Sequence, residues 1–473
     1  MNRTLASPLA VAAAALLAAV AAGSVAPGPA QAVHECGTPH EGKSGHDQGF
    51  GRGCNNLDER GFFYGDPRAD APELAYRGPH PVGVRTVGVV NPDQLDILRY
   101  SDDNTDPRYD RPLTLEVWYP ADLRPEQRQV TTYSDVLGSG PGNPARPILP
   151  FEFAGRAARG AAPNALEGPY PLVIVSHGYP GSRVLMTHLT ENLASKGYVV
   201  VAIDHTESTH GDAVGFSSTL LNRTLDIHFV LNEMARRAAA DSEGFLAGMV
   251  DAERTAIIGY SMGGYGALNA AGAGFSQAAV DLWWGVPGGK LARLQDGNPE
   301  YLALLDPRIR AIVALAPWGG IYDFWDDAGI AGLEVPALFI VGEQDQTAPF
   351  DGVKWLFDNA VNSDRYMLMY QSAIHEIAVN PAPPLAEAHY REYAHYQEPG
   401  WDNRRLNNVN QHFVTAFLGI HLKQDHATYG PYLDLHPISN EANRTDPEDP
   451  TYWKGFTAWA AIGMELHHLT PAP

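Results

Sequence analysis

Short, continuous apolar runs recur between residues 171 and 370 and are separated by stretches with helical spacing. Runs without polar alternation are typical of parallel strands buried on both faces of a sheet. Strands that alternate with helices indicate an α/β fold with a mostly parallel, doubly wound central sheet and helices on both faces. The strands are predicted at 171–176, 198–203, 255–258, 309–316, 335–341 and 366–370, and the helices at 187–196, 218–239 and 262–273.

Two earlier segments, 82–90 and 113–119, alternate between apolar and polar residues and predict strands at an exposed edge of the sheet. The second ends at Pro120, which cannot donate to a strand ladder. We expect one domain over 81–473. Its expected insertions, rich in Pro, Gly and Ala or in aromatic and polar residues, lie at about 131–168, 274–308 and 376–430. The apolar tail is expected to pack on the domain through Trp453, Phe456, Trp459 and Met464.

The first 32 residues have a different composition from the rest of the chain. Arg3 precedes an Ala-rich apolar run over 9–22, and Ala30-Gln31-Ala32 fits a small-x-small cleavage site. This pattern predicts a secretory signal peptide over 1–32 and an exported protein. A membrane anchor is the alternative, but the apolar run is short for a bilayer span. No later run is apolar enough to span one, so we expect no stable membrane insertion.

Residues 33–80 have no sustained apolar periodicity and predict an N-terminal extension. Its Cys36 and Cys54 are the two cysteines of the chain, and in an exported protein they indicate a disulfide. Such a loop stabilises by about 3 kcal/mol in the chain-entropy model. Two free thiols are the alternative. His34, His40 and His46 recur every six residues, a spacing that favours a solvated strip over a metal site.

The formal net charge of −22 at pH 7 disfavours nucleic acid and anionic membranes as partners. It does not identify a substrate.

Gly259-Tyr260-Ser261-Met262-Gly263 matches G-x-S-x-G between a predicted strand and a predicted helix, which is the context that this motif requires. The turn lifts the Ser261 hydroxyl to a helix N-terminus at the sheet edge. Ser261 is therefore the candidate nucleophile, and a plain turn serine is the alternative. A serine hydroxyl needs a base, and the usual chain order is Ser, then Asp or Glu, then His.

Asp345 and His375 follow the next suitable strands in that order. We expect His375 to act as general base and Asp345 to orient it. Glu343 and Asp323 are the competing acids, and Asp345 is preferred because Asp is usual after this strand. His177 and His205 precede Ser261. We expect His177 to support the oxyanion loop and His205 to line or support the site, and a hydrogen-bonded structural histidine is the alternative for each.

The turn His177-Gly178-Tyr179-Pro180-Gly181 follows an early strand. Similar turns in lipases and esterases supply one oxyanion-hole N–H, and the residue after the nucleophile supplies the other. The expected donors are the main-chain N–H groups of Tyr179 and Met262. Trp318 ends the strand between nucleophile and acid, and either lines a substrate pocket or packs in the core.

Together these residues resemble the α/β-hydrolase superfamily, over about 82–470. They are most similar to bacterial secreted dienelactone-hydrolase-like proteins related to platelet-activating-factor acetylhydrolase. The residues that carry this likeness are Leu115-Glu116-Val117-Trp118-Tyr119-Pro120, Val175-Ser176-His177-Gly178, Gly197-Tyr198-Val199-Val200, Gly259-Tyr260-Ser261-Met262-Gly263-Gly264, Asp306-Pro307-Arg308 and Trp453-Lys454-Gly455-Phe456.

Tyr179, Met262 and Trp318 also resemble the cleft residues of cutinase-like polyester hydrolases. The long insertions and the N-terminal extension depart from that family, and Ser261 replaces the cysteine nucleophile of true dienelactone hydrolases.

The sequence therefore predicts carboxylic ester hydrolysis through an acyl-enzyme on Ser261, without metal or cofactor. The substrate is expected to be a small-molecule, lipid or polymer ester. Hydrolysis of polyesters, hydrolysis of amides or peptides, and an inactive hydrolase-fold binding protein are the alternatives. An intact set of Ser261, Asp345, His375 and oxyanion turn disfavours the last, because a binding protein needs none of them.

Overall fold

The structure, a computed structural model, describes residues 63–239 and 242–472, all of which lie in the unit Phe50–Pro473 of the chain. The predicted signal peptide, Cys36, Cys54 and the predicted His-rich strip lie outside the described residues and stay predictions.

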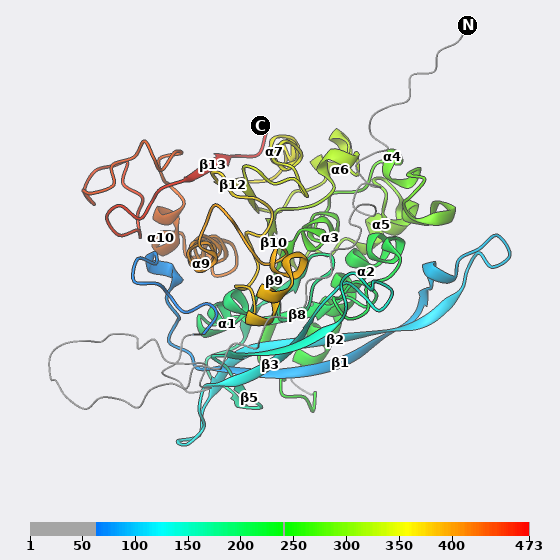
Figure 1. The fold of residues 1–473 in the computed structure, drawn as a ribbon, viewed down its shortest axis with the longest axis horizontal. Helices are drawn as coiled ribbons and strands as arrows, with labels where there is room; N and C mark the ends of the chain where they lie inside the picture. The colour runs from blue at the N-terminus through cyan, green and yellow to red at the C-terminus, as the bar shows by residue number, and fades with distance from the viewer. Residues whose placement is uncertain (1–62, 240–241, 473) are drawn as a thin grey trace, which may run out of the picture. The chain divides into compact units, whose positions relative to one another are not determined.

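A large mixed sheet forms the centre of this unit, and helices lie on both sides of it (Figure 1). Its middle strands pair in parallel in the order β8-β7-β9-β10-β11-β12, and β2 with β1 at one end and β13 at the other pair antiparallel. The strands are β1 (Val82–Leu95), β2 (Arg108–Asp122), β5 (Ala158–Arg159), β6 (Ala162–Pro163), β7 (Tyr170–Ser176), β8 (Val199–Asp204), β9 (Val250–Tyr260), β10 (Ile309–Leu315), β11 (Ala337–Gly342), β12 (Arg365–Tyr370) and β13 (Met464–Leu469). A separate hairpin joins β3 (Thr131–Leu137) and β4 (Leu149–Gly155).

The helices that bear on the site flank the parallel strands. α1 packs on α9, and α2 packs on α3, on the two sides of the sheet (Figure 1). The α-helices are α1 (Thr187–Ser195), α2 (Phe216–Ala238), α3 (Met262–Ala270), α4 (Gln277–Val280), α5 (Pro299–Leu304), α6 (Asp327–Ala331), α7 (Phe350–Asn359), α8 (Tyr390–Tyr393), α9 (Asn403–His421) and α10 (His426–Tyr429). Short 3₁₀ turns are η2 (Glu73–Ala75), η3 (Ile97–Arg99), η4 (Pro287–Leu294), η5 (Gly320–Tyr322), η6 (Pro384–Ala388) and η7 (Gly430–Tyr432).

The predicted α/β class, with a mostly parallel central sheet, is confirmed. The continuous apolar runs form strands because both of their faces are covered, and every residue of β7 and β11 is buried. The helix predicted at 187–196 ends where expected, since Gly197 has a φ of +83°, which a residue with a Cβ rarely adopts.

Some parts of the fold differ from the prediction. The strand predicted at 113–119 is not at an edge: β2 lies between β1 and β8, and Leu115 to Ala121 are buried. The segment 131–168, expected as an insertion, contains the β3–β4 hairpin.

The segment 376–430, expected to contain an insertion, includes α9, whose residues from Leu406 to Ile420 are buried in the core. In the tail Trp453, Phe456 and Met464 pack inside as expected, whereas Trp459 is exposed. The strand β13 was not predicted. Within the described residues, no helix is both long enough and apolar enough to cross a bilayer.

Candidate active site

Ser261 occupies a sharp turn between the end of β9 and the start of α3. Its backbone is strained, with φ of 53° and ψ of −114°. A Cβ on Gly259 would overlap the main chain of Gly263, and a Cβ on Gly263 would overlap the carbonyl of Ser176 on the neighbouring strand. Both glycines are therefore required for the turn to pack this tightly against the sheet. The Ser261 N–H donates to Leu315 O over 2.8 Å, which ties the turn to β10.

His375 and Asp345 lie beside this serine and complete a hydrogen-bonded chain. His375 Nε2 is 3.0 Å from Ser261 Oγ, and His375 Nδ1 is 2.7 Å from Asp345 Oδ2. The second oxygen of Asp345 accepts from the N–H groups of Thr347 and Ala348, each over 2.8 Å. The three side chains meet because parallel β9, β11 and β12 end at the same edge of the sheet.

The competing acids lie elsewhere. Glu343 accepts a hydrogen bond from the N–H of Ser372, and Asp323 is exposed beyond η5. Asp345 is the carboxylate that bonds to His375.

The surroundings of His375 favour its protonated form. Burial alone lowers the pKa of His375. The charge of Asp345, the hydrogen bond to it and the carboxylates of Glu376 and Glu398 outweigh burial and raise this pKa above its usual value. Burial raises the pKa of Glu376 to about 7. An imidazole that gains stability on protonation is suited to accept a proton from Ser261.

Glu398 was not foreseen from the sequence. It is fully buried, and its carboxylate accepts from the N–H of Ile374 over 2.8 Å and from that of Gly400 over 3.2 Å. It thereby holds the loop that carries His375. Glu398 lies 23 residues after His375 in the sequence, in a segment expected to be an insertion, so no local pattern indicates its role. Glu376, by contrast, is adjacent to His375 in the sequence.

The turn His177–Gly181, which is expected to supply one oxyanion donor and is called the oxyanion turn below, lies against Ser261. A Cβ on Gly178 would stand 3.4 Å from the Ser261 Cβ. Among the described residues no acceptor bonds to the main-chain N–H of Tyr179 or of Met262. Met262 is the first residue of α3, where N–H groups have no partner within the helix. Two unpaired donors beside a serine hydroxyl are the arrangement that binds a developing oxyanion.

His177 and His205 lie at this turn, and their hydrogen bonds go to groups other than Ser261. His177 Nδ1 is 2.7 Å from Gly178 O, and the N–H of His205 donates to His177 Nε2 over 3.2 Å. His205 also contacts Ser176 Oγ and Asp226 Oδ2, each at 2.9 Å. Burial lowers the pKa of His177 well below its usual value and that of His205 to about 4. Both histidines are neutral groups with structural partners.

Trp318 lies next to Ser261 in a group of rings. Its main-chain N–H donates to Ser261 O over 3.1 Å, and its partly buried ring stands 5.5 Å from that of Phe216 and 4.9 Å from that of Tyr322. The ring of Tyr179 is 5.1 Å from that of Phe216. We refer to these rings as the aromatic cluster, and its members are Tyr179, Phe216, Trp284, Trp318, Tyr322 and Phe324.

Across residues 63–239 and 242–472, no three His, Cys, Asp or Glu side chains are grouped in a way that would hold a metal ion. The expectation that no cofactor is needed stays a prediction.

Comparisons with known proteins show what this chain is similar to. A family model described as PETase, PET hydrolase-like, matches residues 161–284, which contain Tyr179, Ser261 and Met262. Cutinase est1 of Thermobifida alba is 27% identical over 208 residues, which cover 44% of this chain and 53% of the relative. Cutinase cut1 of Thermobifida fusca is 27% identical over 180 residues, which cover 38% of this chain and 41% of the relative.

The chain thus spans about half the length of the curated relatives that it matches. The solved structure of a ferulic acid esterase from Streptomyces cinnamoneus shares 22% identity and a TM-score of 0.49, and the match covers 75% of this chain and 94% of that chain. The family and cutinase matches confirm the resemblance that the sequence indicated, to serine esterases of the α/β-hydrolase fold with cutinase-like features.

Proposed function

We propose that the protein is a carboxylic ester hydrolase that acts through an acyl-enzyme on Ser261. The observation that carries the proposal is the continuous hydrogen-bonded chain from Asp345 through His375 to Ser261, beside two unpaired main-chain donors. The cutinase relatives support it, because their names describe ester hydrolases.

In the proposed acylation, His375 Nε2 takes the Ser261 hydroxyl proton while Ser261 Oγ bonds to the carbonyl carbon of the ester. The carbonyl π electrons move to oxygen, and the N–H groups of Tyr179 and Met262 bind the resulting oxyanion. When the carbonyl reforms, the bond to the alcohol oxygen breaks and the leaving group takes the proton from His375. Asp345 stabilises the imidazolium between these transfers.

Deacylation repeats the sequence with water. His375 removes a proton from water as the water oxygen bonds to the acyl carbon. When the second tetrahedral intermediate collapses, the bond from the acyl carbon to Ser261 Oγ breaks, the acid is released and His375 returns the proton to Ser261. No cofactor enters these steps.

For the substrate, we propose an ester whose acyl part or alcohol part packs on the aromatic cluster. The rings of Trp318 and Tyr179 both contact the ring of Phe216. The main chain of Trp318 bonds to that of Ser261, and Tyr179 belongs to the turn His177–Gly181. Hydrolysis of an aromatic polyester is a second candidate function, supported by this cluster and by the description of the family model. We also propose export through a cleaved signal peptide over 1–32 and a disulfide between Cys36 and Cys54.

Substitution of the nucleophile tests the proposal directly. Wild-type protein is expected to hydrolyse p-nitrophenyl esters from acetate to palmitate, and Ser261→Ala is expected to lose roughly 10³-fold or more of that activity, since it removes the attacking oxygen. Release of p-nitrophenol is measured for both proteins. Activity that persists in Ser261→Ala, or hydrolysis of amides without esters, would contradict the proposed ester chemistry.

The pH profile tests the role of His375. Because a base must be unprotonated, kcat/KM is expected to fall as the pH drops through the raised pKa of His375, above about 6.5. Asp345→Asn removes the charge that raises this pKa, so the acidic limb should move to lower pH while the maximal rate falls by about 10³- to 10⁴-fold. Glu343→Gln, at the rejected acid, should leave the limb in place. A limb that moves in Glu343→Gln and not in Asp345→Asn would assign the acid to Glu343.

Truncation of Trp318 tests the aromatic cluster. Trp318→Ala is expected to lower kcat/KM for p-nitrophenyl benzoate by roughly 3- to 10-fold more than for p-nitrophenyl acetate, because a ring contact contributes about 0.5–1.5 kcal/mol. Trp459→Ala, at the exposed tail tryptophan, is the matched control and should affect neither ester. Equal losses on both esters would reject an aromatic subsite at Trp318.

The intact mass of protein recovered from culture medium, without reduction, tests export and the disulfide together. The expected mass begins at Val33 and lacks two hydrogen atoms relative to the reduced chain. A mass that retains residues 1–32 argues against cleavage, and a mass with both thiols protonated rules out the Cys36–Cys54 bond.

A further inference from the structure

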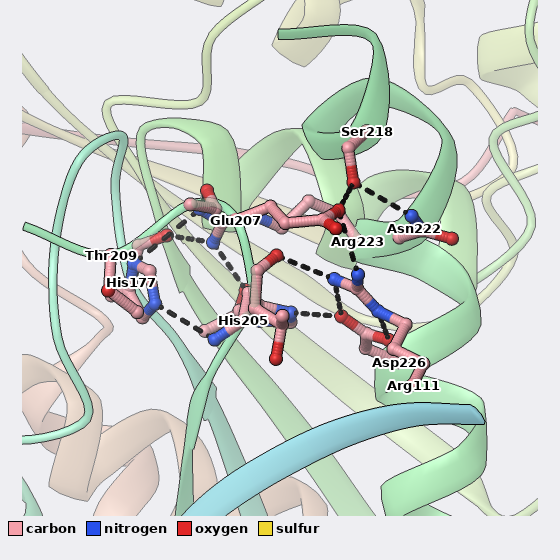
Figure 2. A network of polar contacts seen from close by, with 12 residues as sticks. Arg111, His177, His205, Glu207, Thr209, Ser218, Asn222, Arg223 and Asp226 are labelled. Atoms are coloured by element: carbon pink, nitrogen blue, oxygen red, sulfur yellow. Dashed lines mark hydrogen bonds and ion pairs between the residues drawn. The ribbon is translucent and has the colours of Figure 1, made fainter. Parts of the chain in front are cut away.

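Arg223, in the first half of α2, lies directly behind the oxyanion turn. Its side chain is buried, and its guanidinium donates to the carbonyl oxygen of His177 and, over 2.8 Å, to that of Gly178. It also donates to Ser208 Oγ over 2.5 Å and to Ser176 Oγ over 3.3 Å. Figure 2 shows this arginine in one network with Arg111, His177, His205 and Asp226.

The partners of Arg223 differ in kind from those of the other arginine in this network. Arg111 bonds to both oxygens of Asp226, at 2.8 and 3.0 Å, and is also paired with Glu207 (Figure 2). Among the described residues Arg223 has no ion pair, and its partners are carbonyl and hydroxyl oxygens, with His177 Nδ1 at 3.5 Å. Burial accordingly lowers the pKa of Arg223, against the charge of Asp226. A buried cation held by neutral groups costs free energy, so a role that only a guanidinium fills would account for it.

Helices α2 and α3 pack closely against each other where Arg223 lies. Gly266 of α3 faces α2, and a Cβ at this position would stand 3.0 Å from the Arg223 Cβ. α3 begins at Met262, the second proposed oxyanion donor. The helix that carries Arg223 is therefore packed closely against the helix whose N-terminus forms the other half of the oxyanion hole.

The geometry of the peptide unit links Arg223 to the other donor. In a trans peptide the carbonyl and the N–H of the next residue point in opposite directions. The carbonyl of Gly178 is held from behind by Arg223 and by His177 Nδ1, at 2.8 and 2.7 Å. The N–H on the other side of this peptide belongs to Tyr179, and no described residue accepts from it. A cation bound to a carbonyl oxygen polarises that peptide and strengthens the N–H of the same peptide as a donor.

We propose that Arg223 is a positioning residue for the oxyanion hole, which directs and polarises the Tyr179 N–H through the carbonyls of His177 and Gly178. The inference rests on the proposed function, since it assigns a means of stabilising the oxyanion formed at Ser261. Arg223 does not touch the reacting atoms, so its effect is on the transition state through the Tyr179 N–H.

The test compares Arg223→Met with Asn222→Leu. Asn222 is the preceding residue on α2, is also buried, and donates to Ser218 and not to the turn, so it is a matched polar-to-apolar change. With p-nitrophenyl butyrate, Arg223→Met should lower kcat by about 10- to 100-fold while KM changes by less than about twofold. The affinity for an alkyl trifluoromethyl ketone, which forms an oxyanion adduct with the serine, should fall by a similar factor. Asn222→Leu should leave all three quantities within about threefold of wild type.

Arg223→Lys keeps the charge with fewer donors and should recover part of the lost kcat. It also serves as the test variant if Arg223→Met does not fold. A loss of kcat without a matching loss of ketone affinity, or an equal loss in Asn222→Leu, would mean a merely structural role and overturn the inference.

Different results would overturn the proposed function and the proposed role of Arg223. Wild-type hydrolysis that does not depend on Ser261 would overturn the proposed function and this inference with it. Hydrolysis that depends on Ser261 and keeps its kcat in Arg223→Met would overturn this inference alone.

Discussion

The parallel arrangement of β9, β10, β11 and β12, each paired with the next, is the constraint on which the site depends. These strands end at one edge of the sheet, so the turn with Ser261 and the loops with Asp345 and His375 meet although they are far apart in the sequence. The tight turn requires Gly259 and Gly263, since a side chain at either would overlap the backbone beside it. A shift of one strand in register would separate the serine from its base.

Below this edge lies a layer of buried polar groups that holds the oxyanion turn. Hydrogen bonds join the turn to β8 and α2 through His177, His205, Arg223 and Asp226. Buried polar groups of this kind contribute little net stability, but each partner removed leaves another unsatisfied. The network therefore restricts the conformations of the turn, which is what preorganised donors need for catalysis. The aromatic cluster lies beside the same turn and supplies apolar surface.

Much of the sheet and the three residues of the hydrogen-bonded chain were foreseen because their signals are local. A buried parallel strand is a continuous apolar run, and Ser261 stands in a motif whose spacing follows from the turn itself. Asp345 and His375 were placed by chain order and strand ends, and the structure brings both to Ser261.

The features that were missed depend on contacts between distant segments. Helix α9 has many polar residues, a composition that predicts part of an insertion, although its buried Asn and Gln side chains bond to other parts of the core. Glu398 and Arg223 act through backbone groups far away in the sequence, and such partners leave no pattern in the residues around them. The position of β2 inside the sheet likewise depends on β1 pairing with its outer side.

Trapping of the acyl-enzyme tests the central claim most directly. Protein is mixed briefly with p-nitrophenyl acetate, quenched in acid and digested, and the peptide that contains Ser261 is weighed by mass spectrometry. This peptide is expected to gain the mass of one acetyl group, fragmentation is expected to place the group on Ser261, and the Ser261→Ala peptide is expected to gain none. Turnover of the ester with no acyl group on Ser261, or with the group on another residue, would contradict the central claim.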